Sequence, residues 1–276
     1  MAPSNFTESF EKDLRLKNYC ESSIGNYVSQ VKMFLFAFKQ KDSPKHISES
    51  EIKEWLLKAT SINGRKHRLS ALKLFYKLTV KQPMKFKYIE YPKSERKLPF
   101  PMDVSEIQGI FNACKNLKHR AIIGLLYGCG LRISEAINLK ISDIDSKRMV
   151  ISIIAAKGKK DRQVTLSDPL LKLLRDYFKE YKPNEFLFNG QSSIQYSERS
   201  INEFLKSYGE KAGIKRNIHA HLLRHSWATH SLESGVDISI LQKLLGHNTQ
   251  RSTQIYTHVS PALISKIKSP LEAIKL

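Results

Sequence analysis

The sequence has few cysteines, no long apolar run and no nucleotide-binding glycine loop. Its three cysteines, Cys20, Cys114 and Cys129, lie far apart. Such spacing fits neither a disulfide framework nor a zinc ribbon, so we expect reduced thiols in the cytoplasm. No apolar stretch approaches the roughly 20 residues of a membrane-spanning helix, and the charged segment 6–16 is not a signal peptide. A GxxxxGK[ST] loop is also missing, which argues against an ATP-driven reaction.

Acidic residues are scarce beside basic ones. The chain has 46 Lys and Arg against 26 Asp and Glu, which gives a net charge of +20. Residues 1–100 hold 20 of these basic residues and 10 of the acidic ones, so the excess is spread over the chain rather than gathered in one tail. A protein that is basic throughout usually has a polyanionic partner. A basic protein without such a partner is the alternative.

The first ninety residues have the apolar spacing of amphipathic helices. Aromatic and aliphatic residues recur every three or four positions, which places them on one face of each helix. Four helices of this length form a small bundle with an aromatic core, which we assign to residues 1–89. Ser50 is the predicted N-cap of the third helix. The predicted helices are Phe6–Leu16, Ser22–Phe38, Ser50–Ala59 and Asn63–Thr79.

Residues 90–102 have a different composition, in which Pro92, Pro99 and Pro101 alternate with basic residues. Proline disfavours helix in the residue before it, so this pattern predicts an extended and exposed linker. A basic linker between two basic domains suits a protein that closes around a nucleic acid. An ordinary solvated connection is the alternative.

From residue 103 onward, helical patterns surround one strand-like stretch. The β-branched run Met149–Ile154 and the segment Gln163–Leu166 flank the charged turn Lys157–Arg162. We therefore predict a hairpin with Lys157 on or near its loop, within a mixed α/β domain over residues 103–276. The fold class is mainly α with a small β-hairpin or sheet. The predicted helices are Asp103–Ala113, Arg120–Tyr127, Ile133–Leu139, Asp168–Tyr181, Ser197–Ala212, Ala220–Ser234, Ile238–Leu245 and Pro261–Ile267.

The last quarter of the chain holds an ordered set of polar side chains. His221 and Arg224 are three residues apart and share a helix face, and His247 and Tyr256 follow after a further 23 and 9 residues. Such a set can hold a phosphodiester with cations and attack it with a phenol, because the planar arginine fork binds two oxygens. Each residue alone has an ordinary explanation as a surface or packing residue. A zinc site at His221 and His225 is disfavoured, because the HExxH glutamate is missing and an arginine would face the metal.

Together with Arg132 in GLRISE and Lys157 in AAKGKK, this set makes the chain resemble the tyrosine recombinases, the phage-integrase and Xer family of site-specific DNA strand exchangers. The resemblance is close over residues 100–260 and looser before them. It implies a SAM-like, core-binding N-terminal helical domain and a catalytic domain of the DNA breaking-and-rejoining type. Trp227 replaces the usual Phe, and Ala136–Ile137 replaces a Leu pair. Neither departure touches the inferred chemistry.

The resemblance assigns the binding of the scissile phosphate to four residues. Arg132 and Arg224 would stabilise its non-bridging oxygens. His221 would contact the same phosphate and help to manage the proton of the nucleophile. His247 would donate a hydrogen bond to a non-bridging oxygen. Glu135 would orient Arg132 or cap its helix.

The resemblance also assigns the covalent chemistry. Tyr256 would attack the phosphate and leave a 3′-phosphotyrosyl bond with a free 5′-hydroxyl, without ATP, metal or cofactor. Lys157 would protonate the leaving oxygen, and Lys159 and Lys160 are close competitors for this role.

The implied partner is double-stranded DNA with a specific recombination site. Four protomers would act on two sites, either as copies of this chain or with a related sister subunit, and segment 258–276 would reach a neighbouring protomer. Further DNA contacts are predicted from Arg65, Lys66 and Arg68 in GRKHR and from Lys159 and Lys160. A merely solvated helix end is the alternative for GRKHR.

Two other functions are compatible with this chemistry or fold. A type IB topoisomerase would relax supercoils without a tetramer. A DNA-binding regulator could keep the fold without catalysis, although such a protein has no need of an intact nucleophile.

Overall fold

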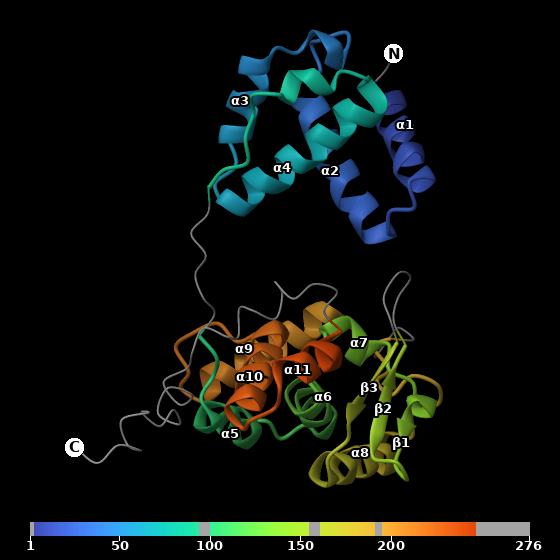
Figure 1. Cartoon of the computed structure of the whole chain (residues 1–276), viewed down its shortest axis with the longest axis vertical. Coiled ribbons are helices and arrows are strands. Elements are labelled where there is room, and N and C mark those ends of the chain that lie inside the picture. The colour runs from blue at the N-terminus through green and yellow to red at the C-terminus, as the bar shows by residue number, and fades with distance from the viewer. Residues whose placement is uncertain (1–2, 94–99, 155–160, 191–194, 247–276) are drawn as a thin grey trace, which may run out of the picture. The chain divides into compact units, whose positions relative to one another are not determined.

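The computed structural model describes residues 3–93, 100–154, 161–190 and 195–246. The chain divides into two compact units, Met1–Lys97 and Leu98–Leu276 (Figure 1). The predicted linker, residues 90–102, spans this division, and its residues 94–99 lie outside the described ones. The exact domain boundaries stay a prediction.

The N-terminal unit contains the predicted four helices. Its core is rich in aromatic rings: Phe34 meets Trp55 edge-on with ring centroids 5.1 Å apart, and Phe10 meets Phe75 at 5.3 Å. Such edge-to-face pairs add to the stabilisation from buried apolar area. The buried Tyr76 hydroxyl donates to Pro44 O at 2.7 Å and is thereby satisfied. The helices are α1 (Pro3–Leu16), α2 (Glu21–Ala37), α3 (Glu49–Leu57) and α4 (Ile62–Phe75).

Two local predictions in this unit were wrong. Ser48 caps α3 instead of Ser50: its hydroxyl accepts from Glu51 N at 3.3 Å, and the Glu51 carboxylate accepts from Ser48 N at 2.8 Å. These two hydrogen bonds satisfy two backbone N–H groups, whereas a serine cap alone satisfies one. The fourth helix was predicted to reach residue 79, but α4 ends at Phe75 and a π-helical turn, η2 (Tyr76–Val80), follows it. Short 3-10 turns occur at η1 (Pro44–His46) and η3 (Pro83–Phe86).

The C-terminal unit is built around one apolar helix, α6 (Leu117–Gly128). Its residues 121–126 are all buried, and a helix that is apolar on most sides belongs in the centre of a domain. Gly124 lets α8 approach closely, because a Cβ at this position would lie 2.8 Å from Leu170 Cδ1. The surrounding helices are α5 (Val104–Ala113), α7 (Ile133–Ile137), α8 (Asp168–Tyr181), α9 (Glu198–Lys211), α10 (Ala220–Glu233) and α11 (Ile238–Leu245).

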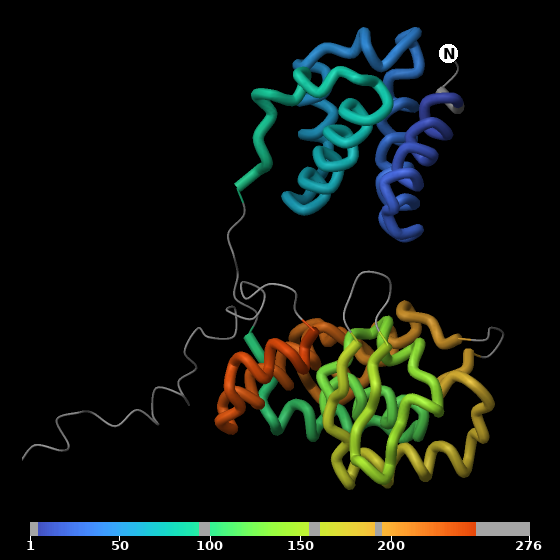
Figure 2. The backbone as a smooth tube through the Cα atoms, turned by 45° about the vertical axis from the view of Figure 1, so that its right-hand side comes forward, coloured from blue at the N-terminus to red at the C-terminus, as the bar shows by residue number. Residues whose placement is uncertain are grey.

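The predicted hairpin is confirmed, and a third strand joins it (Figure 2). The sheet is antiparallel in the order β1 (Ile144–Asp145), β2 (Val150–Ile153) and β3 (Arg162–Thr165). Ile153 pairs with Arg162, so β3 begins one residue earlier than predicted. Strand β1 was not predicted, because its two residues are too few to show the alternating pattern of a strand. A short 3-10 turn, η4 (Ile141–Asp143), precedes β1. None of the helices that the structure describes is long and apolar enough to span a membrane.

Candidate active site

Helix α10 presents two of the predicted site residues. His219 caps its N-terminus, with Nδ1 accepting from Leu222 N at 3.2 Å. His221 follows in the first turn and is exposed, whereas Arg224 is only 1% exposed. Both residues lie on α10, as predicted, three positions apart. A buried arginine needs acceptors, because its guanidinium stays charged in proteins.

Arg224 finds those acceptors in backbone carbonyls. Its Nη1 donates to Gly130 O at 2.5 Å, and its Nη2 donates to Leu245 O at 2.6 Å. It also forms an ion pair with Glu135 at 3.7 Å. The arginine therefore connects α10 to the turn before α7 and to the end of α11.

Arg132 lies at the N-terminus of α7, directly after the turn that holds Gly130. Gly130 has φ +61° and lies against the ring of Trp227, where an added Cβ would come within 2.2 Å of the ring. Only glycine combines this backbone conformation with such a close approach. Arg132 donates to Glu135 Oε1 at 2.7 Å and to Gly246 O at 3.1 Å. Its side chain is 26% exposed, the most accessible among Arg132, Arg162 and Arg224.

A third arginine, Arg162, completes the cluster, and the sequence did not predict it. Its Nη1 and Nη2 donate to the two oxygens of Glu135 at 2.9 and 2.7 Å. Its Nε donates to Leu244 O at 2.6 Å. Arg162 comes from β3, 27 residues from Glu135 in the chain. No local motif in the sequence signals that these two side chains meet.

Glu135 is the common partner of all three arginines. Burial raises its pKa, but the hydrogen bonds from Arg162 and from Arg132 N outweigh burial and lower the pKa to about 2. The carboxylate is therefore ionised throughout the physiological range. Three guanidinium groups face one carboxylate, so the cluster keeps a net positive charge suited to an anion. Glu135 was predicted to orient Arg132 or to cap its helix, and it accepts from both Arg132 Nη1 and Arg132 N.

Two histidines beside the cluster have lowered pKa values. Partial withdrawal from water, then the charges of Arg224, His219 and Arg132, lowers the pKa of His221 below 6.5. Burial and the neighbouring His221 and Arg224 lower the pKa of His225 to about 4. Both rings are thus neutral at pH 7. The two ring centroids are 4.6 Å apart in an edge-on arrangement. The described residues contain no group of three or more side chains that could hold a metal.

Several predicted site residues lie outside the described residues. Lys157, Lys159 and Lys160 fall between β2 and β3, in residues 155–160. His247 and Tyr256 fall in residues 247–276, and His247 comes directly after Gly246. Their predicted roles stay predictions.

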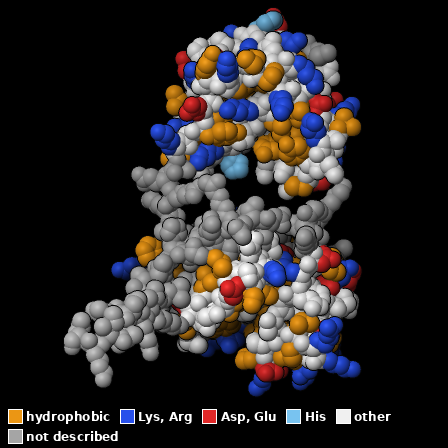
Figure 3. All heavy atoms as spheres, in the orientation of Figure 1, with side chains coloured by type: hydrophobic (Ala, Val, Ile, Leu, Met, Phe, Trp, Pro, Cys, Tyr) orange, Lys and Arg blue, Asp and Glu red, His pale blue; other side chains and the backbone are white. Residues whose placement is uncertain are grey.

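The N-terminal unit places the predicted DNA contacts Arg65, Lys66 and Arg68 on α4. Arg68 already has partners, since it donates to Trp55 O at 3.1 Å and lies over the Trp55 ring at 4.5 Å. Arg65 and Lys66 are half-buried in the first turns. Beside them α2 and α4 border a hollow of about 580 Å³, lined by polar residues including Gln30 and His67. Figure 3 shows basic side chains spread over the visible surface of this unit.

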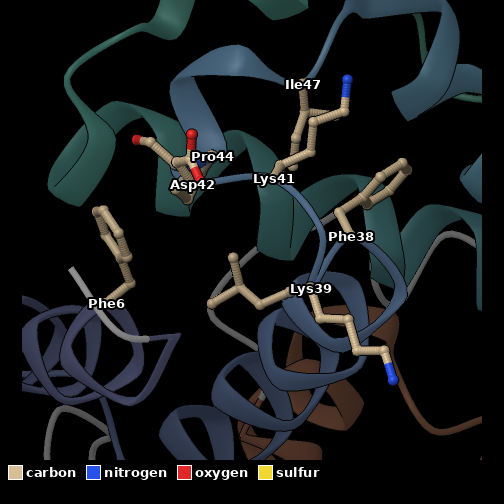
Figure 4. Close-up of a pocket in the computed structure, with 9 residues that line it drawn as sticks. Phe6, Phe38, Lys39, Lys41, Asp42, Pro44 and Ile47 are labelled. Atoms are coloured by element: carbon tan, nitrogen blue, oxygen red, sulfur yellow. The ribbon is translucent and has the colours of Figure 1, made fainter.

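A second hollow in the same unit offers no site. It lies between the end of α2 and η1 and is lined by Phe6, Phe38, Pro44 and Ile47, with Lys39, Lys41 and Asp42 at its rim (Figure 4). Its volume of about 20 Å³ holds no more than a water molecule.

The chain is a mainly helical protein of two units, and its arginine cluster carries a net positive charge that can attract an anion. Comparison with known proteins identifies its family. Residues 101–262 match the Phage integrase family, and residues 6–85 match the phage integrase N-terminal SAM-like domain. The chain belongs to the phage integrase family and is a tyrosine-type site-specific recombinase, which confirms the resemblance and the fold class.

Individual relatives match over nearly the whole chain. The tyrosine recombinase XerA of Pyrococcus horikoshii is 34% identical over 99% of this chain and 94% of its own length. A putative integrase/recombinase, y4qK, of Sinorhizobium fredii is 30% identical over 97% and 88%. Among solved structures, the XerH recombinase in a post-cleavage complex with its palindromic difH substrate has a TM-score of 0.72 at 24% identity. That match covers 94% of this chain and 83% of the other, and it supports the fold.

Proposed function

We propose that this recombinase cleaves and rejoins double-stranded DNA at a specific site through a 3′-phosphotyrosyl intermediate, with no need of ATP or metal. One observation carries the proposal: Arg132 and Arg224 come from different elements and meet at one carboxylate, Glu135. Because these fixed cations outnumber the carboxylate, an anion can complete the site. The scissile phosphate is that anion in this proposal.

The arginines stabilise the transition state. Attack on a phosphodiester puts extra negative charge on the non-bridging oxygens, and fixed guanidinium groups meet that charge without reorganising. Arg132, the more exposed of the two, contacts the phosphate from the α7 side, and Arg224 contacts it from α10. His247 donates to a non-bridging oxygen, as family membership suggests.

Tyr256 is the nucleophile of this scheme. Its phenolic oxygen bonds to phosphorus while the bond from phosphorus to the 5′-oxygen breaks. The phenol proton leaves to a base, for which the neutral His221 is suited because its pKa lies below 6.5. Lys157 gives a proton to the departing 5′-oxygen. A 5′-hydroxyl of the partner strand then attacks the phosphotyrosine. A new bond from phosphorus to the 5′-oxygen forms as the bond to Tyr256 breaks, which restores the phosphodiester and the free tyrosine. The energy of the original bond is kept in the covalent intermediate.

Partner assembly follows from the same proposal. Two DNA sites are brought together by four protomers, with or without a sister subunit, and residues 258–276 reach a neighbouring protomer. The N-terminal unit adds contacts through Arg65, Lys66 and Arg68 beside the hollow between α2 and α4. Similar structures support a DNA partner, since a XerH recombinase is bound to its difH substrate and a lambda integrase dimer is bound to a COC′ core site. The enzyme works in the cytoplasm, with the DNA.

A plasmid assay tests the function and separates it from DNA relaxation. The site is first isolated by selecting genomic fragments that the full-length protein retains. A supercoiled plasmid with two directly repeated copies of that site is then incubated with the protein, without ATP and with EDTA. We expect two smaller circles, and none from a plasmid with a single site. Relaxation of a plasmid without any site, and no smaller circles, would identify a topoisomerase instead.

A further inference from the structure

Arg162 makes three side-chain hydrogen bonds within the cluster. Its fork spans both oxygens of Glu135 at 2.9 and 2.7 Å, and its side chain is only 8% exposed. All three guanidinium nitrogens of Arg162 are bonded within the cluster, Nη1 and Nη2 to Glu135 and Nε to Leu244 O. We propose that Arg162 is a positioning residue of the recombinase, which holds Glu135 and the end of α11 so that Arg132 and Arg224 face the scissile phosphate.

Arg162 fixes the orientation of the Glu135 carboxylate. A carboxylate bonded at only one oxygen can rotate about its last torsion, which is broad for glutamate. Arg162 closes two parallel hydrogen bonds on the carboxylate, and such bidentate pairs fix its plane. In that plane Oε1 also accepts from Arg132 at 2.7 Å, and Oε2 lies 3.7 Å from Arg224. One orientation of Glu135 therefore sets the position of both phosphate-binding arginines.

Arg162 also binds the C-terminal end of α11. Three successive carbonyls at this helix end, those of Leu244, Leu245 and Gly246, accept from Arg162, Arg224 and Arg132 in turn. The C-terminal end of a helix carries partial negative charge, so cations stabilise it.

Gly246 permits this close packing. It has φ +59°, and an added Cβ would lie 3.2 Å from Arg162. The residue after it is His247. Arg162 thus holds the end of α11, directly before His247, the residue proposed to donate a hydrogen bond to the phosphate.

Arg162 also ties these parts to the sheet. It is the first residue of β3 and pairs with Ile153 of β2. One side chain therefore connects β3, α7 and α11. Without the two hydrogen bonds from the Arg162 guanidinium, the Glu135 carboxylate should be less firmly oriented and should have a higher pKa. Both effects weaken the hold of Glu135 on Arg132 and Arg224. This inference rests on the proposed function, because it assumes that those two arginines bind the phosphate.

The charges around Glu135 determine the test. Arg132 at the start of α7, Arg162 from β3 and Arg224 from α10 face its carboxylate. Lys140 and Asp143 line, together with Glu135, a hollow of about 540 Å³. Hydrogen bonding by Arg162 leads the causes that lower the pKa of Glu135 against burial. Without that bond the pKa of Glu135 rises, so the carboxylate becomes protonated at a higher pH in the Arg162 variants than in the wild type. A purely structural arginine would not change the pH profile in this way.

The experiment uses the full-length protein with Arg162→Lys and Arg162→Gln. Single-turnover cleavage of a nicked site DNA is measured from about pH 5.5 to pH 8, with binding to the same DNA and thermal unfolding in parallel. Arg120→Lys is the matched control, because Arg120 also caps a helix end, donating to Phe111 O at 2.6 Å and Cys114 O at 3.1 Å. The rate of each variant is divided by the wild-type rate at each pH, which removes effects of His221 common to both.

We expect both Arg162 variants to bind the DNA within about twofold of wild type and to cleave it about tenfold or more slowly at pH 7.5. Their rate ratios should fall further toward pH 5.5, most steeply for Arg162→Gln, while the ratio for Arg120→Lys stays flat. Flat ratios in both Arg162 variants overturn the inference. So does loss of cooperative unfolding in both, because Arg162 would then be required for the fold. Absence of any cleavage by wild type, on DNA that it binds specifically, refutes the proposed function instead.

Discussion

Replacement of Glu135 by glutamine removes the carboxylate that the three arginines share. The pKa of Glu135 lies at about 2, against an ordinary 4.5, and its side chain is 13% exposed. Ionisation in the folded state is therefore worth about 3 kcal/mol of unfolding free energy at neutral pH. Glutamine has the shape of the protonated acid, so Glu135→Gln should lose about this amount at pH 7.

The pH dependence of this loss has a definite sign. A carboxylate with a lowered folded-state pKa stabilises the protein fully above its unfolded pKa and loses this effect as the pH falls toward the folded one. The difference between wild type and Glu135→Gln should thus be full above about pH 5.5, shrink to about 1.5 kcal/mol near pH 3 and vanish below pH 2.

Urea unfolding followed by fluorescence measures this difference. The chain has two tryptophans, and Trp227 lies against Gly130 in the C-terminal unit. A Trp55→Phe background therefore reports on that unit alone. A loss below about 1 kcal/mol at pH 7, or a loss that stays constant down to pH 3, would refute the account of Glu135 as an ionised hub.

Three further predictions concern catalysis and binding. Arg224→Lys should raise the activation free energy of cleavage by roughly 3–4 kcal/mol and so slow it about a hundredfold to a thousandfold, because lysine keeps the charge but loses the planar fork. Arg199→Lys, at an exposed arginine, is the control, and near-native cleavage by Arg224→Lys would contradict a phosphate-binding role. Lys157→Ala should slow cleavage of normal DNA far more than cleavage of DNA with sulfur as the 5′ leaving atom, since a thiolate leaves without a proton. Equal losses on the two substrates would mean that Lys157 is not the general acid. If the sulfur substrate restored cleavage by a Lys159 or Lys160 variant instead, that lysine would be the general acid. The slope of log affinity against log salt should be steeper for the full chain than for residues 103–276 by at least about 2, which corresponds to two or more phosphate contacts by the N-terminal unit; equal slopes would mean that this unit does not contact the DNA backbone.

Much of the fold could be predicted from the sequence, because apolar period and capping residues are local signals. The helix from Asp103 to Ala113 and the hairpin around residues 155–160 were predicted in this way and confirmed. The same signals were available for Ser48, since Glu51 stands three residues after it as a capping box requires. The break after Phe75 had no such signal, because the apolar spacing continues through the π-helical turn.

The candidate site was only partly predictable. Its ordered motif identifies the family, and Glu135 was expected to orient Arg132 because both stand in GLRISE. Arg162 was not predicted, because its contact with Glu135 forms only when β3 packs beside α7. Arg68 was predicted as a DNA contact from its place in a basic run, but its stacking on Trp55 depends on how α3 meets α4. Contacts between distant segments thus decide what a charged residue does, and a single sequence does not show them.

The most direct test of the account is the covalent bond to Tyr256. Wild-type protein and Tyr256→Phe are incubated with site DNA that is nicked beside the scissile phosphate, so that the released strand diffuses away. We expect a protein–DNA adduct on a denaturing gel for the wild type, and peptide mass spectrometry should find the nucleotide on Tyr256. The phenylalanine variant should bind the DNA equally well without forming an adduct. An adduct that persists in Tyr256→Phe would contradict the central claim.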